Sequence, residues 1–286
     1  MNERFIIKNK PVELISALTI LTVIMLISPL TVISSADLGS KSGTVFWDNN
    51  HNGIYDEGDA PIANIEVRLY KWNETLNDWE YSSSTYTGDG GSYSFSDLEA
   101  YKYKVEVVDP ASECCDLIIN TTPKYYEFEL NEGEVEIGND FGFVCLKQLT
   151  NAKSKGYWSW SIYNKKTSTW MTTVTNEDVA YINNELGTSF EDTLNLANYL
   201  VSPVYGDMKT ILTQQLIATL LNLRYGYIDG GTVIYYDGVF YSIDEVVDAA
   251  KNSLSNGDRC EQEYWKDILD TINNNLIYYL VTMPCE

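Results

Sequence analysis

The sequence contains one histidine, His51, among its 286 residues. A Ser-His-Asp triad requires a histidine beside the nucleophile, and a zinc site with two histidine ligands requires a second imidazole. The five cysteines lack the spacing of zinc-binding motifs, and no glycine-rich phosphate-binding loop stands in the sequence. We therefore predict that the protein is not an enzyme. The alternative is an extracellular hydrolase with a carboxylate pair among its 41 acidic residues, because a sequence does not show how far apart two carboxylates lie.

Basic residues are scarce: 19 Lys and Arg stand against 41 Asp and Glu, for a formal net charge of −22. We therefore expect no nucleic acid partner, because binding to phosphates needs a basic surface. An acidic surface favours solubility and divalent cations, although most of these carboxylates serve only as solvated surface. Apolar residues make up 44% of the chain and aromatic residues 13%, which suits the buried cores of two domains.

Long hydrophobic runs are absent except at the N-terminus. Three basic residues precede an uncharged run over residues 14–36 that is rich in Ile, Leu and Val. The run ends in Ser34-Ser35-Ala36, small residues of the kind that a signal peptidase recognises, so we expect a signal peptide over residues 1–36. An uncleaved membrane anchor is the alternative. We predict a secreted or cell-surface protein with no transmembrane segment after signal cleavage.

The cysteines all follow the predicted signal peptide, where disulfides persist. Because five is an odd number, one thiol is left over or forms an intermolecular bond. The adjacent Cys114 and Cys115 would form a strained ring, so each is expected to bond elsewhere. A helix expected between Cys260 and Cys285 would hold those two apart. The favoured pair is Cys145 with Cys285.

One acidic stretch, residues 48–59, has the oxygen spacing of a twelve-residue calcium loop. Gly53 holds position six, where the backbone turns sharply, and position twelve is Asp instead of the longer Glu. The alternative is an Asx-turn loop whose side chains bond only to its own backbone. The predicted Ca²⁺ ligands are the side chains of Asp48, Asn50, Asn52, Asp56 and Asp59 and the main-chain carbonyl of Ile54.

From residue 42 to residue 144 the pattern is one of short alternating strands separated by turns, as in a β-sandwich. Strands are expected at residues 44–47, 64–70, 79–87, 93–95, 101–108, 126–130 and 140–143. We therefore predict an all-β sandwich over residues 37–144.

After residue 145 the period changes to that of helices. Helices are expected at residues 176–186, 189–200 with Ser189 as the N-cap, 208–224, 246–254 after a Ser242–Glu245 capping box, and 261–280. A hairpin is expected over residues 233–241. The predicted fold class is α+β multidomain, with a mainly α domain over residues 145–286.

Separated motifs of the first domain resemble the SdrD-type B-like domain, a prealbumin-like sandwich of bacterial and archaeal surface proteins. They are Gly43-Thr-Val-Phe-Trp-Asp48, Asn50-x-Asn52-Gly53-x-x-Asp56-x-Gly58-Asp59, Val67-Arg-Leu-Tyr70, Gly91-Ser-Tyr-Ser-Phe95 and Asp140-Phe-Gly-Phe143. The resemblance implies that the first loop binds calcium and that the ion stiffens the domain.

The second half resembles a domain found at the C-termini of secreted microbial proteins. The matching segments are Gly156-Tyr-Trp158, the helix Gln215-Leu-Ile-Ala-Thr-Leu-Leu-Asn222 and Ile268-Leu-Asp-Thr-Ile-Asn-Asn274. This resemblance implies the order of the segments in the domain and a secreted location. It implies no activity.

These features predict a structural or adhesion protein of the cell surface, whose partner is a protein or glycan of the envelope or matrix. The alternative is a carbohydrate-binding module that uses exposed aromatic side chains. The candidate platforms are Tyr235, Tyr236 and Tyr241, or Trp158 and Trp160, although burial in the core is the favoured interpretation of the two tryptophans. Two sequons, at Asn73 and Asn120, are candidate glycosylation sites, and short sequons also arise by chance.

Overall fold

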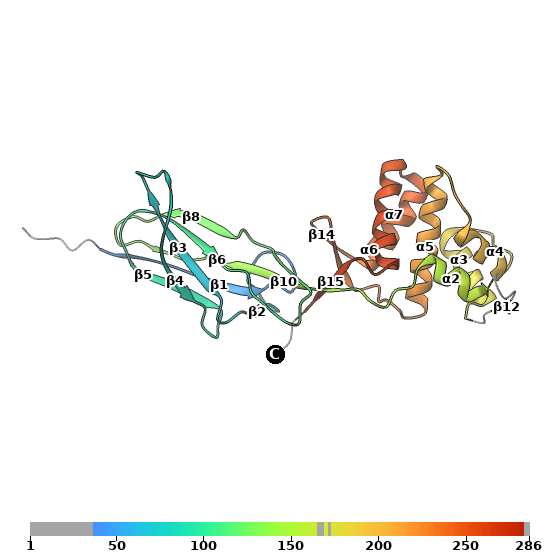
Figure 1. The fold of residues 1–286 in the computed structure, drawn as a ribbon, viewed down its shortest axis with the longest axis horizontal. Coiled ribbons are helices and arrows are strands. Elements are labelled where there is room, and N and C mark those ends of the chain that lie inside the picture. Colours follow the sequence, from blue (N-terminus) through green and yellow to red (C-terminus); the bar gives the residue numbers. More distant parts are fainter. Residues whose placement is uncertain (1–36, 165–168, 171–172, 283–286) are drawn as a thin grey trace, which may run out of the picture.

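The computed structural model describes residues 37–164, 169–170 and 173–282, and shows a β-sandwich followed by a helical part (Figure 1). The predicted signal peptide and Cys285 lie outside the described residues. Within the described residues, no helix has the length and apolar character needed to cross a membrane.

One sheet of the sandwich is built around β1 (Gly39–Trp47), which pairs with β10 (Phe141–Gln148) in parallel and with β5 (Ser92–Leu98) in antiparallel fashion. The shorter strands β2 (Ala60–Pro61), β7 (Leu117–Asn120) and β9 (Val135–Glu136) join its edges.

The second sheet has the order β4 (Asp78–Tyr86), β3 (Glu66–Asn73), β6 (Lys102–Val107) and β8 (Tyr125–Glu129). Strict alternation along these strands turns Val67, Leu69 and Val105 inward, where they are buried with Phe141 and Phe143 of the first sheet. The predicted β-sandwich is confirmed, and β7 is a strand that the sequence did not predict.

The helical part contains α2 (Lys155–Ile162), α3 (Asn176–Leu186), α4 (Thr193–Val201), α5 (Met208–Arg224), α6 (Ile243–Asn256) and α7 (Arg259–Asn273), with a short pair of strands, β11 (Tyr163–Asn164) and β12 (Thr169–Trp170). Helix α5 is buried along most of its length. The buried Asn273 of α7 donates to the Gln215 carbonyl over 2.9 Å and accepts from Asn222 over 3.0 Å, so polar groups inside this core are paired.

Helix α6 begins at Ile243, three residues before the predicted start at residue 246, and two further predicted helix limits are wrong. Helix α4 begins after Asp192, whose carboxylate accepts the backbone N–H of Asn195, so Asp192 and not Ser189 is the N-cap. Helix α7 ends at Asn273, and Asn275 then takes a positive φ of 56°. The chain continues as β15 (Tyr278–Val281), where the sequence predicted helix to residue 280.

The two parts share a sheet. Strand β15 pairs with β10, and the predicted hairpin of β13 (Val233–Tyr236) and β14 (Val239–Ser242) extends the same sheet through β15. The boundary predicted between residues 144 and 145 falls inside β10. The sandwich and the helical part are therefore joined by backbone hydrogen bonds as well as by the chain.

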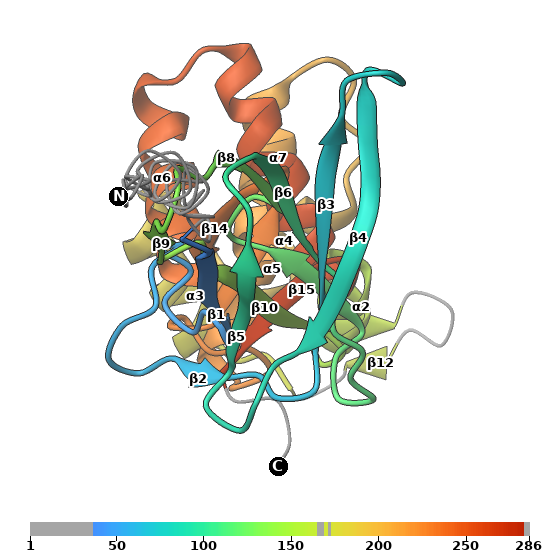
Figure 2. The ribbon, with the colours of Figure 1, turned by 90° about the vertical axis from the view of Figure 1, so that its left-hand side faces the viewer.

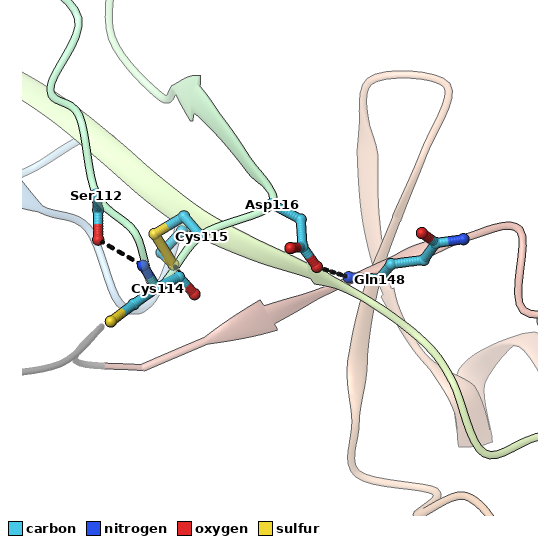
Figure 3. The surroundings of a disulfide bond; sticks show 6 residues. Ser112, Cys114, Cys115, Asp116 and Gln148 are labelled. Atoms are coloured by element: carbon cyan, nitrogen blue, oxygen red, sulfur yellow. Dashed lines mark hydrogen bonds between the residues drawn. A yellow bond between two sulfur atoms is a disulfide. The ribbon is translucent and has the colours of Figure 1, made fainter.

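The predicted disulfide between Cys145 and Cys285 is wrong, because Cys145 bonds to Cys115 (Figure 3). Pairing of β7 with β10 places Ile118 opposite Cys145, and the two bonded cysteines have Cα atoms 5.3 Å apart. Cys114 also forms a disulfide, so the prediction that these neighbours bond elsewhere is confirmed. Among the described cysteines, Cys260 is free and exposed.

Candidate metal site

The predicted calcium loop, residues 48–59, fills the connection between β1 and β2. Trp47 at the end of β1 pairs with Ala60 at the start of β2, so the twelve residues form a closed loop. The backbone N–H of Asp48 donates to the carbonyl of Phe143 over 2.8 Å, which fixes the start of the loop to β10.

Asp48 occupies the interior of this loop. The residue is only 1% exposed, and its two carboxylate oxygens accept the backbone N–H of Asn52 over 3.1 Å and of Gly53 over 2.7 Å. Gly53 has a φ of 76°, a conformation that glycine adopts without steric cost, so the predicted turn at position six is present. The carboxylate thus fixes the backbone turn at Asn52 and Gly53 from inside the loop.

The next two predicted ligands form consecutive Asx-turns. The Asn50 side-chain oxygen accepts the N–H of Asn52 over 3.1 Å, and the Asn52 side-chain oxygen accepts the N–H of Ile54 over 2.7 Å. The amide nitrogens of Asn50 and Asn52 donate to the two carboxylate oxygens of Asp56, each over 2.9 Å. The structure thus brings these three side chains together.

Asp59 closes the loop. One of its carboxylate oxygens accepts the N–H of Asn49 over 2.9 Å and the other accepts the N–H of Asp56 over 3.1 Å. The Ile54 side chain is exposed. The predicted Ca²⁺ ligand at this position is the backbone carbonyl and not the side chain.

The donor set fits a hard cation in its chemistry, because carboxylate, amide and carbonyl oxygens are the ligands that Ca²⁺ takes. Asn side chains and a backbone carbonyl supply half of the six predicted groups. Within the described part of the chain, no three His, Cys, Asp or Glu side chains are grouped so that they hold a metal ion by themselves. A cation in this loop would therefore depend on the amide oxygens as well as on the carboxylates.

His51, at position four of the loop, contacts the hairpin of β13 and β14. Its φ is 51°, and its ring stacks on Phe240 of β14, with ring centroids 4.5 Å apart. The loop sequence alone does not reveal this contact between His51 and β14.

The aromatic platforms named from the sequence are only partly exposed. Trp158 is fully buried and packs against Tyr225 and Tyr227, which confirms core burial for this residue, whereas Trp160 is 49% exposed. Tyr241 is half-buried and its hydroxyl lies 3.0 Å from that of Tyr264.

A different group of aromatic residues lies on the outer face of the second sheet, and sequence reasoning missed it. Tyr70 and Trp72 of β3 stand opposite Tyr81 and Trp79 of β4. The signal was present in the sequence: Tyr-x-Trp and Trp-x-Tyr flank the turn between these two strands.

The two sequons lie in different surroundings. Asn73 ends β3 at the β3–β4 hairpin, and its amide nitrogen donates to Glu80 over 2.9 Å. The amide nitrogen of Asn120 in β7 is buried, without a hydrogen-bond partner among the described residues.

The fold described above belongs to the class of two-sheet β-sandwiches with an added helical part. Residues 39–118 match the family model of the SdrD B-like domain, as the sequence motifs had predicted. The match covers the candidate metal loop.

Colossin-B of Dictyostelium discoideum is 33% identical over 66 residues, which cover 23% of this chain and 2% of Colossin-B. Among solved structures, the major plantain pollen allergen Pla l 1 is 15% identical, with a TM-score of 0.30, over 37% of this chain and 93% of the allergen. The minor pilin GBS52 of Streptococcus agalactiae is 10% identical, with a TM-score of 0.26, over 37% of this chain and 45% of the pilin chain. This chain thus spans a small fraction of Colossin-B and less than half of that pilin chain.

Proposed function

We propose that this protein is a structural or adhesion component of the cell surface or its surroundings, in which Ca²⁺ bound by residues 48–59 stiffens the β-sandwich. Its work is to hold and present surfaces, not to turn over a substrate. The family match over residues 39–118 supports this, since the SdrD-type B-like domain that these residues resemble is a domain of surface proteins. The disulfide between Cys115 and Cys145 supports an exported location, because disulfides persist in oxidising compartments.

The observation that carries the calcium proposal is the buried carboxylate of Asp48 at the centre of a loop whose turns are already formed. Asp48, Asn50, Asn52 and Asp56 would hold the ion, joined by the Ile54 carbonyl and by Asp59. The ion would supply positive charge between these oxygens and tie the loop to β1 and β10. Extracellular calcium modules bind with a Kd of roughly 10⁻⁴–10⁻³ M, so occupancy would follow the calcium level of the medium.

Calorimetric titration of the folded protein with CaCl₂, and with MgCl₂ in parallel, tests this function. One bound Ca²⁺ per chain and much weaker Mg²⁺ binding are expected, because Mg²⁺ requires near-ideal octahedral geometry and gives up water reluctantly. If millimolar CaCl₂ gave no heat of binding, the calcium proposal would be wrong, and residues 48–59 would form an Asx-turn loop that needs no metal.

The helical part serves in this proposal as an interaction domain fixed to the sandwich through β10 and β15. The sequence-based alternative is a carbohydrate-binding platform on Tyr235, Tyr236 and Tyr241 or on Trp158 and Trp160. The complete burial of Trp158 disfavours the platform that includes it.

A further inference from the structure

Strand β4 forms an open edge of the second sheet. It stands at the end of the order β4, β3, β6 and β8, and no strand among the described residues pairs with its other side. Figure 2 shows β4 as the outermost strand of this sheet, at one side of the molecule. Tyr81 and Tyr86 of β4 are 56% and 62% exposed, so the edge is open to solvent. Such an edge offers unpaired N–H and C=O groups to another strand.

The backbone groups that face outward from this edge follow from the hydrogen bonds at its end. The Thr87 N–H donates to the carbonyl of Ile65 over 3.0 Å, and the Thr87 carbonyl accepts the N–H of Asn64 over 2.9 Å. Thr87 therefore bonds toward β3. Because backbone groups alternate between the two sides of an antiparallel strand, those of Ser84 and Tyr86 point away from β3.

The edge has little of the side-chain protection that keeps exposed strands from pairing. Such strands usually carry charged residues, above all lysine, or proline. Residues 78–88 contain no lysine and no proline, and residues 81–88 carry no charge in a chain in which 21% of the residues are charged. A β-bulge at Ser82 interrupts only the start of this uncharged segment. By contrast β8, at the opposite edge of the same sheet, carries Glu127 and Glu129.

The edge is complementary to a second copy of itself. Ser83 and Thr85 pair with Leu69 and Val67 of β3, whose side chains are buried in the sandwich, so both point to the inner face and Ser84 points to the outer face. Antiparallel pairing about a two-fold axis at Ser84 sets Ser84 opposite its copy and Ser83 opposite Thr85 of the second copy. Opposed residues then share a face, and the opposed hydroxyls can hydrogen-bond across the strands.

The same register keeps like charges apart. Asp78 and Glu80 precede the paired segment, so in an antiparallel pair they lie at the end where the second copy has the uncharged Thr87 and Gly88. The chain then leaves the edge, because the Gly91 N–H donates to the Gly88 carbonyl over 2.8 Å in the turn to β5. Like charges directly opposite each other would destabilise the pair, and this register opposes none.

We propose that two copies of this protein associate through antiparallel pairing of their β4 strands about Ser84, which joins their second sheets into one continuous sheet. The contact is isologous: the same segment serves on both copies and the assembly closes with two-fold symmetry. The outward backbone groups of Ser84 and Tyr86 supply the hydrogen bonds. Residues 48–59 take no part in this edge, so dimerisation and calcium binding fail independently.

Sedimentation equilibrium of the chain from Asp37 to Glu286, with Cys260→Ser to remove the free exposed thiol, tests the proposal. A reversible dimer is expected. Ser84→Pro should raise its Kd about tenfold or more, because it removes an outward N–H from both copies. Proline is tolerated on an edge strand where its missing N–H faces solvent, so the melting temperature should stay near that of the parent. Ser84→Lys should weaken the dimer likewise, because it sets two like charges opposite each other.

Disulfide trapping tests the register. Opposed residues of a hydrogen-bonded antiparallel pair have Cα atoms about 5.5 Å apart, within the range that a disulfide spans. In the Cys260→Ser background, Ser84→Cys should give a covalent dimer on mild oxidation. Ser94→Cys is the matched control, because Ser94 is an exposed serine of β5 in the first sheet, and it should stay monomeric.

Three results would overturn the proposal. A dimer of unchanged Kd in Ser84→Pro and Ser84→Lys would place the contact elsewhere, and equal trapping of Ser84→Cys and Ser94→Cys would contradict the register. A chain that stays monomeric throughout would exclude self-pairing and leave a strand of a different protein as the occupant of this edge.

Discussion

The imidazole ring of His51 lies nearly parallel to the phenyl ring of Phe240, with 7° between their planes and 4.5 Å between their centroids. His51 belongs to the candidate metal loop and Phe240 to β14 of the hairpin that extends the shared sheet. The loop thus contacts the second half of the chain directly. A stiffer loop would limit movement of the hairpin against the sandwich.

Replacement of Phe240 by Ala should loosen the loop as well as the hairpin. The stacked pair contributes about 0.5–1.5 kcal/mol, so the free energy of unfolding should fall by that order. Hydrogen exchange of residues 48–59 should rise in Phe240→Ala and stay near the wild-type level in Phe240→Tyr, which keeps the ring. Unchanged loop exchange in the alanine variant would show that the stacking does not couple the two parts.

The carboxylate of Asp48 should be decisive for calcium affinity. Asp48→Asn keeps one oxygen that accepts a hydrogen bond but removes the buried negative charge, so we expect the calcium Kd to rise about tenfold or more, which is a loss of about 1.4 kcal/mol. Asp89→Asn is the matched control, because Asp89 is an exposed aspartate in the turn before β5. Calorimetric titration measures both, and equal affinities would contradict the ligand role of Asp48.

The disulfide between Cys115 and Cys145 should stabilise the sandwich. It closes a loop with a sequence separation of 30 residues, and removal of such a bond costs about 2–4 kcal/mol. Cys115→Ser should lower the free energy of unfolding by this order in chemical denaturation. Cys260→Ser should have little effect, since Cys260 is free and exposed. If the two variants were equally stable, Cys115 would not be bonded in the folded protein.

Lys41 should oppose folding at neutral pH. Its side chain is fully buried on β1, and its ammonium lies 3.6 Å from Glu136, with no hydrogen-bond partner among the described residues. Burial lowers the pKa of Lys41 below its usual value, an effect that Glu136 only partly offsets. Lys41→Met should therefore raise the free energy of unfolding at pH 7 by about 1 kcal/mol or more.

The sign of this effect sets its pH dependence. Because the folded-state pKa of Lys41 is lower than the unfolded value of about 10.4, the folded state binds fewer protons between the two values. The unfavourable contribution is complete below the folded-state pKa and disappears as the pH rises through the unfolded value. The advantage of Lys41→Met should shrink over that window, and Lys124→Met, at an exposed lysine, is the control.

Local sequence patterns predicted those parts of the fold that are determined locally. Residues 208–224 form a helix with the predicted limits, because apolar residues recur at helical spacing between Asp207 and Gly226. Strand β3 follows from the alternation of Val67 and Leu69.

Features that depend on partners distant in the sequence were missed. Residues 278–281 are a strand only because β10 is available to pair with them, and the Cys115–Cys145 bond depends on β7, which lacks alternation. The contact of His51 with Phe240 joins residues that the sequence placed in separate domains.

Thermal unfolding in 10 mM CaCl₂ and in EGTA tests the central claim most directly. With a Kd of about 10⁻⁴–10⁻³ M, that concentration of calcium should stabilise the folded chain by about 1.4–2.7 kcal/mol. The melting temperature should then rise by roughly 3–10 °C in calcium, and Asp48→Asn should abolish most of the rise. Superimposable unfolding curves in calcium and in EGTA would contradict the account.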